Sequence, residues 1–92
     1  YKIVQLTSAK QLYTEGMNMS HCVASYGYRC AAGELSIWSL RRVENGEEHP
    51  LVTIELSAQG RIVQMAQAFN ESPNMFQTRL IQRWAKQERL CF

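Results

Sequence analysis

The sequence predicts an α+β fold: a three- to four-stranded antiparallel meander packed against two N-terminal helices and one C-terminal helix. Residues 35–67 contain three strand-like segments joined by short turns, a pattern typical of neighbouring antiparallel strands. Helical periodicity lies on both sides of this region. With 92 residues, 46% of them hydrophobic and 20% charged, the chain fits a single domain, 1–92, with one modest core.

The N-terminal part predicts a strand and then a helix. Residues 2–6, KIVQL, form a short apolar run that fits an added edge strand. Thr7 or Ser8 is the expected N-cap of the helix that follows, and Gly16 is its expected end. The apolar face of this helix is predicted to contain Ala9, Leu12 and Tyr13.

A second helix is predicted over residues 21–32, with Ser20 as its N-cap and Gly33 at its end. In such a helix Cys22 and Cys30 share one face but lie about 12 Å apart along the axis. A disulfide requires Cα atoms within about 7 Å, and one zinc ion could not readily bind both sulfurs. We therefore expect Cys30 in the core, no metal site and no cofactor.

The middle of the chain predicts three strands. Asn45-Gly46, inside the turn at 44–50, is a strong hairpin signal, and a second tight turn is expected at 58–60. In the second strand three apolar residues alternate with two polar ones, so the two sets face opposite sides of the sheet. The apolar set is Val52, Ile54 and Leu56; the polar set is Thr53 and Glu55.

The last helix is predicted over residues 74–90, after a loop whose exit Pro73 fixes. Its buried side is expected to contain Phe76, Leu80, Ile81 and Trp84, and its basic residues follow one stripe: Arg79, Arg83, Lys86 and Arg89. A stripe of this kind fits either an ordinary solvated helix face or a surface that tracks phosphates.

Cys22 is the candidate nucleophile. The start of a helix lowers a thiol pKa, and a catalytic thiol needs a base within about 3.2 Å. His21 points away from Cys22 on a helix, so the partner would come from the polar sheet face that carries Glu55 and Gln64. The alternative is that Cys22 is simply a small buried residue.

The composition predicts a cytoplasmic location in the cell. No apolar run in this sequence is long enough for a membrane helix, none has the basic-then-apolar pattern of a signal peptide, and the net charge is only +2. Three cysteines, an odd number, favour a reducing cytoplasm over a disulfide framework. Because the chain begins at Tyr1 and not at methionine, we expect it to be part of a longer protein.

Several motifs together resemble the PcfJ-like family. They are M-x-H-C-V-x-x-Y at 19–26, T-I-E at 53–55, the glutamine at 64 and N-x-x-P at 70–73. Members of this family occur on conjugative plasmids, phages and related mobile elements. The resemblance implies an accessory role in that setting, and it gives weight to His21, Cys22, Glu55 and Gln64.

Three functions remain open at this stage. A binding module for single-stranded DNA or RNA would use a polar pocket of His21, Gln64, Gln67 and Asn70, with Arg79, Arg83 and Lys86 facing phosphates. A docking domain would bind the coupling or relaxase proteins of conjugation. An enzyme would use Cys22 as nucleophile, with His21 or Glu55 as acid/base partner and Gln64 nearby.

Overall fold

Four antiparallel strands form one sheet in the order β1-β2-β3-β4. The computed structural model describes residues 1–19 and 27–92, except for the side chain of Tyr28. The strands are β1 (Lys2–Leu6), β2 (Leu35–Glu44), β3 (Glu47–Ser57) and β4 (Ile62–Ala66). The predicted meander is confirmed, and residues 2–6 do add a fourth strand at its edge.

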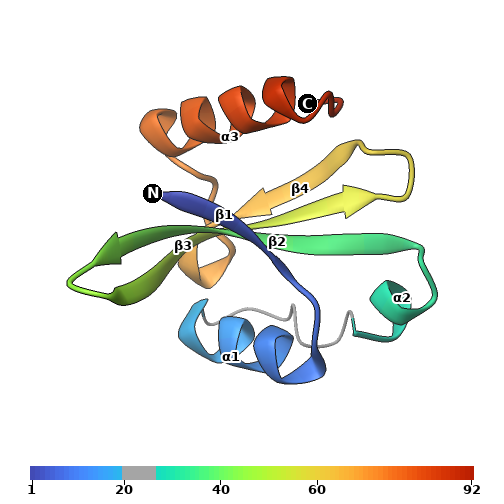
Figure 1. Ribbon diagram of the computed structural model, residues 1–92, viewed down its shortest axis with the longest axis horizontal. Helices are drawn as coiled ribbons and strands as arrows, with labels where there is room; N and C mark the ends of the chain where they lie inside the picture. Colours follow the sequence, from blue (N-terminus) through green and yellow to red (C-terminus); the bar gives the residue numbers. More distant parts are fainter. Residues whose placement is uncertain (20–26) are drawn as a thin grey trace.

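Helices cover both faces of this sheet (Figure 1). Those described are α1 (Ala9–Met19), α2 (Gly27–Ala31), the short 3-10 helix η2 (Ala68–Asn70) and α3 (Met75–Gln87). The helices α1 and α2 lie on one face and α3 lies on the other (Figure 1). The α+β class is therefore confirmed, with the N-terminal and C-terminal helices separated by the sheet. No helix in residues 1–19 or 27–92 is long and apolar enough to cross a membrane.

The turns that join the strands follow the sequence signals. Asn45 and Gly46 connect β2 to β3 with φ of 53° and 79°, the two positive values that a type I′ hairpin requires. Gly60, with φ of 81°, closes the turn between β3 and β4. These tight connections place consecutive strands side by side without a crossover.

Two apolar clusters form the core, one on each side of the sheet. Under α1 and α2 the buried residues are Leu6, Leu12, Leu35 and Ile37, with Val4 and Cys30 partly buried against them. Under α3 the buried residues are Leu40, Val52, Ile54, Leu56 and Ile81. Trp38 and Trp84 pack against this second cluster, with ring centroids 5.2 Å apart. The alternation in β3 thus supplies side chains to both layers, as predicted.

Side-chain caps start two of the helices. Ser8 Oγ accepts a hydrogen bond from the Gln11 backbone N–H, and Gln11 Oε1 accepts one from the Ser8 N–H, which forms a capping box at α1. Asn74 and Gln77 make the same reciprocal pair at α3. Of the two N-caps considered for the first helix, Ser8 is the one that the structure selects.

The end of the second helix is confirmed by its hydrogen bonds. The Glu34 N–H donates to the Arg29 carbonyl and the Gly33 N–H donates to the Cys30 carbonyl, and Gly33 has a φ of 76°. These two bonds define a Schellman motif, which favours glycine at the left-handed position. The start predicted for this helix, at residues 20–26, lies outside the described residues.

Gly16 does not end the first helix, which was predicted to stop there. The helix α1 continues to Met19, and both Gly16 and Met19 are buried. A glycine inside a helix costs about 1 kcal/mol relative to alanine, and burial of Met19 offsets this cost.

Two aromatic residues predicted on buried helix faces are exposed. Tyr13 of α1 is 61% exposed, because the buried face of that helix is formed by Leu12, Glu15, Gly16 and Met19. Phe76 of α3 is 53% exposed. It lies at the rim of the helix while Ile81 occupies the centre of the interface.

Candidate functional site

Glu55 and Gln64 are direct partners across β3 and β4. Their side chains lie on the sheet face that α1 covers, in the same cross-strand row as Ile37. Glu55 is half-buried and Gln64 is exposed. The structure thus brings together two of the four residues predicted for catalysis. The other two, His21 and Cys22, lie outside the described residues, so the enzymatic hypothesis stays a prediction.

Cys30 is close enough to Glu55 to be affected by its charge. Burial of Cys30, followed by the negative charge of Glu55, raises the pKa of this thiol. A raised pKa keeps the thiol protonated at neutral pH, and a protonated thiol is a weak nucleophile. Cys30 is partly buried against the apolar cluster that contains Leu6 and Leu12, so it lies at the edge of the core and not inside it as predicted.

A buried carboxylate lies between α1 and the sheet, and the sequence analysis did not single it out as a site. The Glu15 side chain is fully buried. It accepts hydrogen bonds from Thr53 Oγ1 at 2.7 Å and from Ser39 Oγ at 3.1 Å, and Arg41 Nη2 lies 3.5 Å from its Oε1. A signal was available: Glu15 lies at the i+3 position from Leu12 and i−4 from Met19, on the buried face of the helix.

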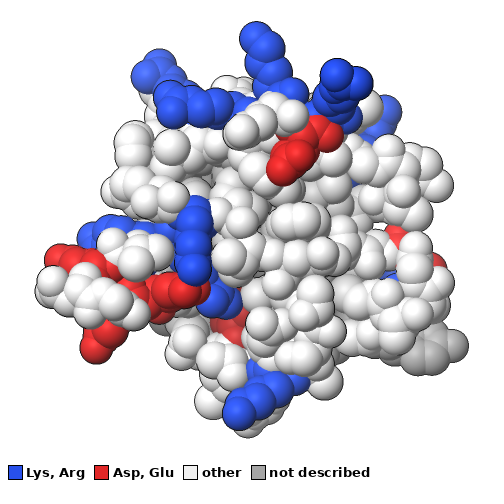
Figure 2. Space-filling model, in the orientation of Figure 1, with Lys and Arg blue, Asp and Glu red and all other residues white. Residues whose placement is uncertain are grey.

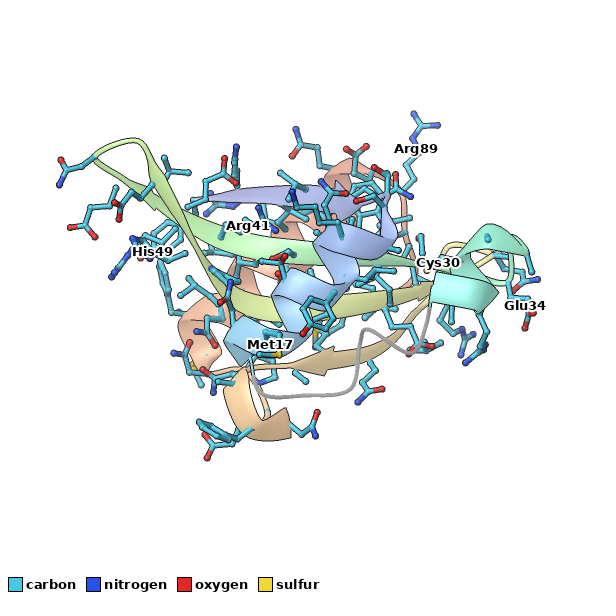
Figure 3. All side chains as sticks on the ribbon, turned by 90° about the horizontal axis from the view of Figure 1, so that it is seen from below. Met17, Cys30, Glu34, Arg41, His49 and Arg89 are labelled. Carbon is cyan, nitrogen blue, oxygen red and sulfur yellow. The ribbon has the colours of Figure 1, made fainter. Side chains whose placement is uncertain are left out.

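Arg41 connects this buried carboxylate to the surface. Its Nη1 lies 3.0 Å from Glu48 Oε1, and Lys2 Nζ lies 2.6 Å from Glu48 Oε2. Figure 3 shows Arg41 beside α1, on the sheet face that α1 covers. Charges of alternating sign, Glu15, Arg41, Glu48 and Lys2, thus run from the core to the edge strand β1.

We expect the Glu48 pair to make stability depend on pH. Hydrogen bonds from Lys2 and then Arg41 lower the Glu48 pKa. A carboxylate with a lowered folded-state pKa stabilises the fold above its unfolded pKa of about 4.3, and this contribution is lost as pH falls through the folded value. In chemical unfolding, Glu48→Gln should lower stability at neutral pH and match the wild type in strong acid. Gln82→Ala, at an exposed position without a titratable group, should show no such pH-dependent difference.

The basic stripe on α3 lies on the opposite side of the sheet. We use this name for Arg79, Arg83 and Lys86, which are all exposed. Figure 2 shows Lys and Arg side chains gathered along the α3 edge of the molecule, with one acidic side chain among them. Arg89, the fourth predicted member, lies past the end of α3 with a φ of 58°. Among the described residues, no carboxylate pairs with any of these four cations.

Gln67 and Asn70 are not part of that stripe. Gln67 Nε2 donates to the Ser72 carbonyl at 2.7 Å and holds the loop after β4 in place. Asn70 belongs to η2, which contacts α1 on the face opposite α3 (Figure 1). The described members of the predicted polar pocket, Gln64, Gln67 and Asn70, therefore lie away from the predicted phosphate-facing stripe, with the sheet between them.

A shallow groove of about 170 Å³ runs between β1 and α3. Ile3, Leu40, Leu80 and Trp84 contribute apolar surface to it, and Tyr1, Lys2, Arg83 and Gln87 complete its lining. A second, larger cavity of about 370 Å³ lies under the start of α1, where Leu6, Leu12, Cys30 and Leu35 line it together with residues of the β1–α1 turn. Only the groove adjoins the basic stripe, since Arg83 belongs to both.

Clustered metal ligands are not found in the described part of the chain: no group of three or more His, Cys, Asp or Glu side chains there could hold a metal ion. Figure 3 places His49 at the hairpin end of the molecule and Cys30 at the other end.

Comparison with protein families gives one match. Residues 1–80 match the PcfJ-like protein family. The chain belongs to this family. Comparisons with curated proteins and with solved structures found no match.

The PcfJ-like match covers the sheet, the α1 and α2 helices and the first part of α3. It therefore includes Glu15, Glu55, Gln64 and Arg79, while Arg83 and Lys86 lie beyond the matched residues. The Glu15 cluster belongs to the part of this chain that has the PcfJ-like pattern. Most of the basic stripe lies in the part that follows it.

Proposed function

We propose that this PcfJ-like chain is an accessory domain of a mobile-element protein and that its basic stripe binds the phosphates of single-stranded DNA or RNA. Lysine and arginine side chains that neutralise phosphates release condensed counterions, which drives association. The net charge of the chain is only +2, so the proposal rests on where the charges lie and not on their total.

The observation that carries this proposal is that the cations of the basic stripe have no acidic partner among the described residues. Of the six basic residues elsewhere in the described chain, four lie within 4 Å of a carboxylate and Lys10 and Arg61 do not; the four are Lys2, Arg29, Arg41 and Arg42. The helix α3 contains no acidic residue, and among the described residues none of the basic stripe has such a partner. A helix face that only needed hydration could carry both signs of charge. A helix face whose charged residues are all cations is electrostatically complementary to a polyanion.

Docking to a protein of the transfer machinery is the second candidate. An acidic surface on a coupling or relaxase protein would complement the same stripe, because electrostatic complementarity directs protein association as well. The salt dependence of binding distinguishes nucleic-acid binding from protein docking. A single-stranded nucleic acid gives a slope of log affinity against log salt of about −0.7 per phosphate neutralised.

We expect the double substitution Arg79→Gln and Lys86→Gln to weaken binding of a fluorescent oligothymidylate and to reduce the magnitude of its salt slope by about 1.4. Anisotropy titrations across a series of salt concentrations measure both quantities. The matched control is Lys10→Gln with Arg42→Gln, which removes the same charge from other surfaces and should leave the slope close to the wild-type value. Equal slopes for the two double variants, or no binding of the wild type, would contradict the proposal.

A further inference from the structure

An exposed aromatic pair adjoins the groove between β1 and α3: one ring lines the groove and the other packs against it. Tyr1 lines the groove and is 60% exposed. Its ring centroid lies 5.2 Å from that of Phe76, which is 53% exposed, and the planes meet at 66°. Much of this aromatic surface faces water although an apolar core lies directly beneath α3. An exposed ring pair beside an apolar depression is a surface on which a flat ligand can stack.

The side of α3 next to the groove carries two apolar residues followed by two polar ones. Phe76, Leu80, Arg83 and Gln87 follow one another at spacings of four, three and four, so they lie along one side of the helix. Arg83 supplies a cation without a carboxylate partner among the described residues, and Gln87 supplies an exposed amide that can both donate and accept hydrogen bonds. An apolar floor, an aromatic end and a cationic rim thus occur together.

Of the two cations that line this groove, only Arg83 is available to a ligand. Lys2 is held by Glu48, with 2.6 Å between Nζ and Oε2. No acidic residue lines the groove. Its charge therefore complements an anion, and its volume of about 170 Å³ is smaller than the roughly 300–1,000 Å³ of a typical small-molecule pocket. A single ring attached to a charged chain fits these limits better than a whole cofactor.

We propose that this groove holds one unpaired base of a single-stranded nucleic acid, stacked at the Tyr1–Phe76 end, with Arg83 at the adjoining phosphate. The inference rests on the proposed nucleic-acid function, and it explains why the domain would bind single strands in preference to a duplex. In a duplex the bases are paired and stacked on each other, so their faces cannot enter such a groove. An acidic peptide is the competing occupant, and it would need Arg83 but no base.

The test compares an oligothymidylate with an abasic oligomer of the same length, which has the same phosphates and no bases. Stacking of one base is worth roughly a 5- to 150-fold change in affinity. The wild type should therefore bind the oligothymidylate more tightly than the abasic oligomer by about that factor. Phe76→Ala should remove this preference and leave abasic binding unchanged, while Phe76→Trp should retain it. Trp84 lines the groove, so its fluorescence should change with the oligothymidylate and not with the abasic oligomer.

Met75→Ala is the matched control, because Met75 is an apolar residue on the same turn of α3 and is 70% exposed, but it has no ring that can stack on a base as the Tyr1–Phe76 pair can. It should keep the full preference. Equal affinity for the two oligomers, with both weakened by the Arg79 and Lys86 double substitution, would overturn the base site and leave the phosphate proposal standing. Absence of binding to either oligomer would overturn both. Binding of an acidic peptide that depends on Arg83, without any preference for bases, would assign the groove to a protein partner.

Discussion

Replacing Glu15 with alanine is expected to destabilise the domain by about 1–3 kcal/mol for each buried hydroxyl that loses its acceptor. The substitution leaves the hydroxyls of Ser39 and Thr53 without their buried acceptor and removes the carboxylate beside Arg41. Domains of this size have a total unfolding free energy of about 5–15 kcal/mol. Chemical unfolding followed by circular dichroism would measure the loss.

The control for this substitution is Thr14→Ala, one position earlier on the exposed side of α1. Exposed changes of this kind alter stability by about 0.5 kcal/mol or less. Glu15→Gln should fall between the two, because the amide oxygen can still accept a hydroxyl hydrogen bond while the charge next to Arg41 is lost. If Glu15→Ala were as stable as Thr14→Ala, the buried cluster would not contribute to folding.

A triple variant separates the structural role of Glu15 from a functional one. Replacing Glu15 with leucine, Ser39 with alanine and Thr53 with valine removes the two hydroxyl donors and their carboxylate acceptor together, which can be nearly neutral for stability. A protein that folds in this form and still binds nucleic acid would place Glu15 among the residues that stabilise the fold. A folded protein that has lost binding would link the buried cluster to function.

Strong local signals explain how much of the fold the sequence predicted. The alternation of Val52, Ile54 and Leu56 with Thr53 and Glu55 has the exact period of a strand, and both sets lie on the predicted faces. Asn45-Gly46 predicts a hairpin because both residues adopt positive φ easily. In each case a short stretch of chain contains all the information that determines the local structure.

The predictions that failed depend on contacts between distant segments. Gly16 looked like a helix end because local propensity disfavours glycine inside a helix, whereas burial of Met19 against the fold decides the outcome. Phe76 matched the apolar periodicity of α3, but Ile81 takes the centre of the interface and the ring remains at the rim. Tertiary packing therefore overrides a local preference of about 1 kcal/mol.

The candidate site was predictable only in part for the same reason. Pairing of Glu55 with Gln64 follows from the register of β3 and β4, which the tight turn at Gly60 fixes. Glu15 reaches Ser39 and Thr53, 24 and 38 positions away in the chain, and no periodic pattern shows such a contact. The separation of Gln67 and Asn70 from the basic stripe likewise depends on the sheet lying between them.

The second large effect is expected at Ile81, the α3 residue at the centre of the interface with the sheet. Ile81 has no exposed surface and packs in the cluster of Leu40, Val52, Ile54 and Leu56. Ile81→Ala should cost about 2–5 kcal/mol, the lost transfer free energy plus the cavity that remains, and Ile81→Val about 0.5–1.5 kcal/mol. Gln82→Ala, the next residue and exposed, should change stability little.

These variants also test whether nucleic-acid binding by α3 depends on how the helix packs on the sheet or only on its charges. The helix is held by an apolar face centred on Ile81, whereas the basic stripe lies on its exposed face. At a temperature where Ile81→Ala is still folded, its affinity for the abasic oligomer should stay close to wild type, because Arg79, Arg83 and Lys86 are unchanged. On warming, binding of Ile81→Ala should fall together with its ellipticity, and the wild type should retain both. Loss of the preference for oligothymidylate over the abasic oligomer in a folded Ile81→Ala protein would show that the position of α3 on the sheet shapes the groove beside β1.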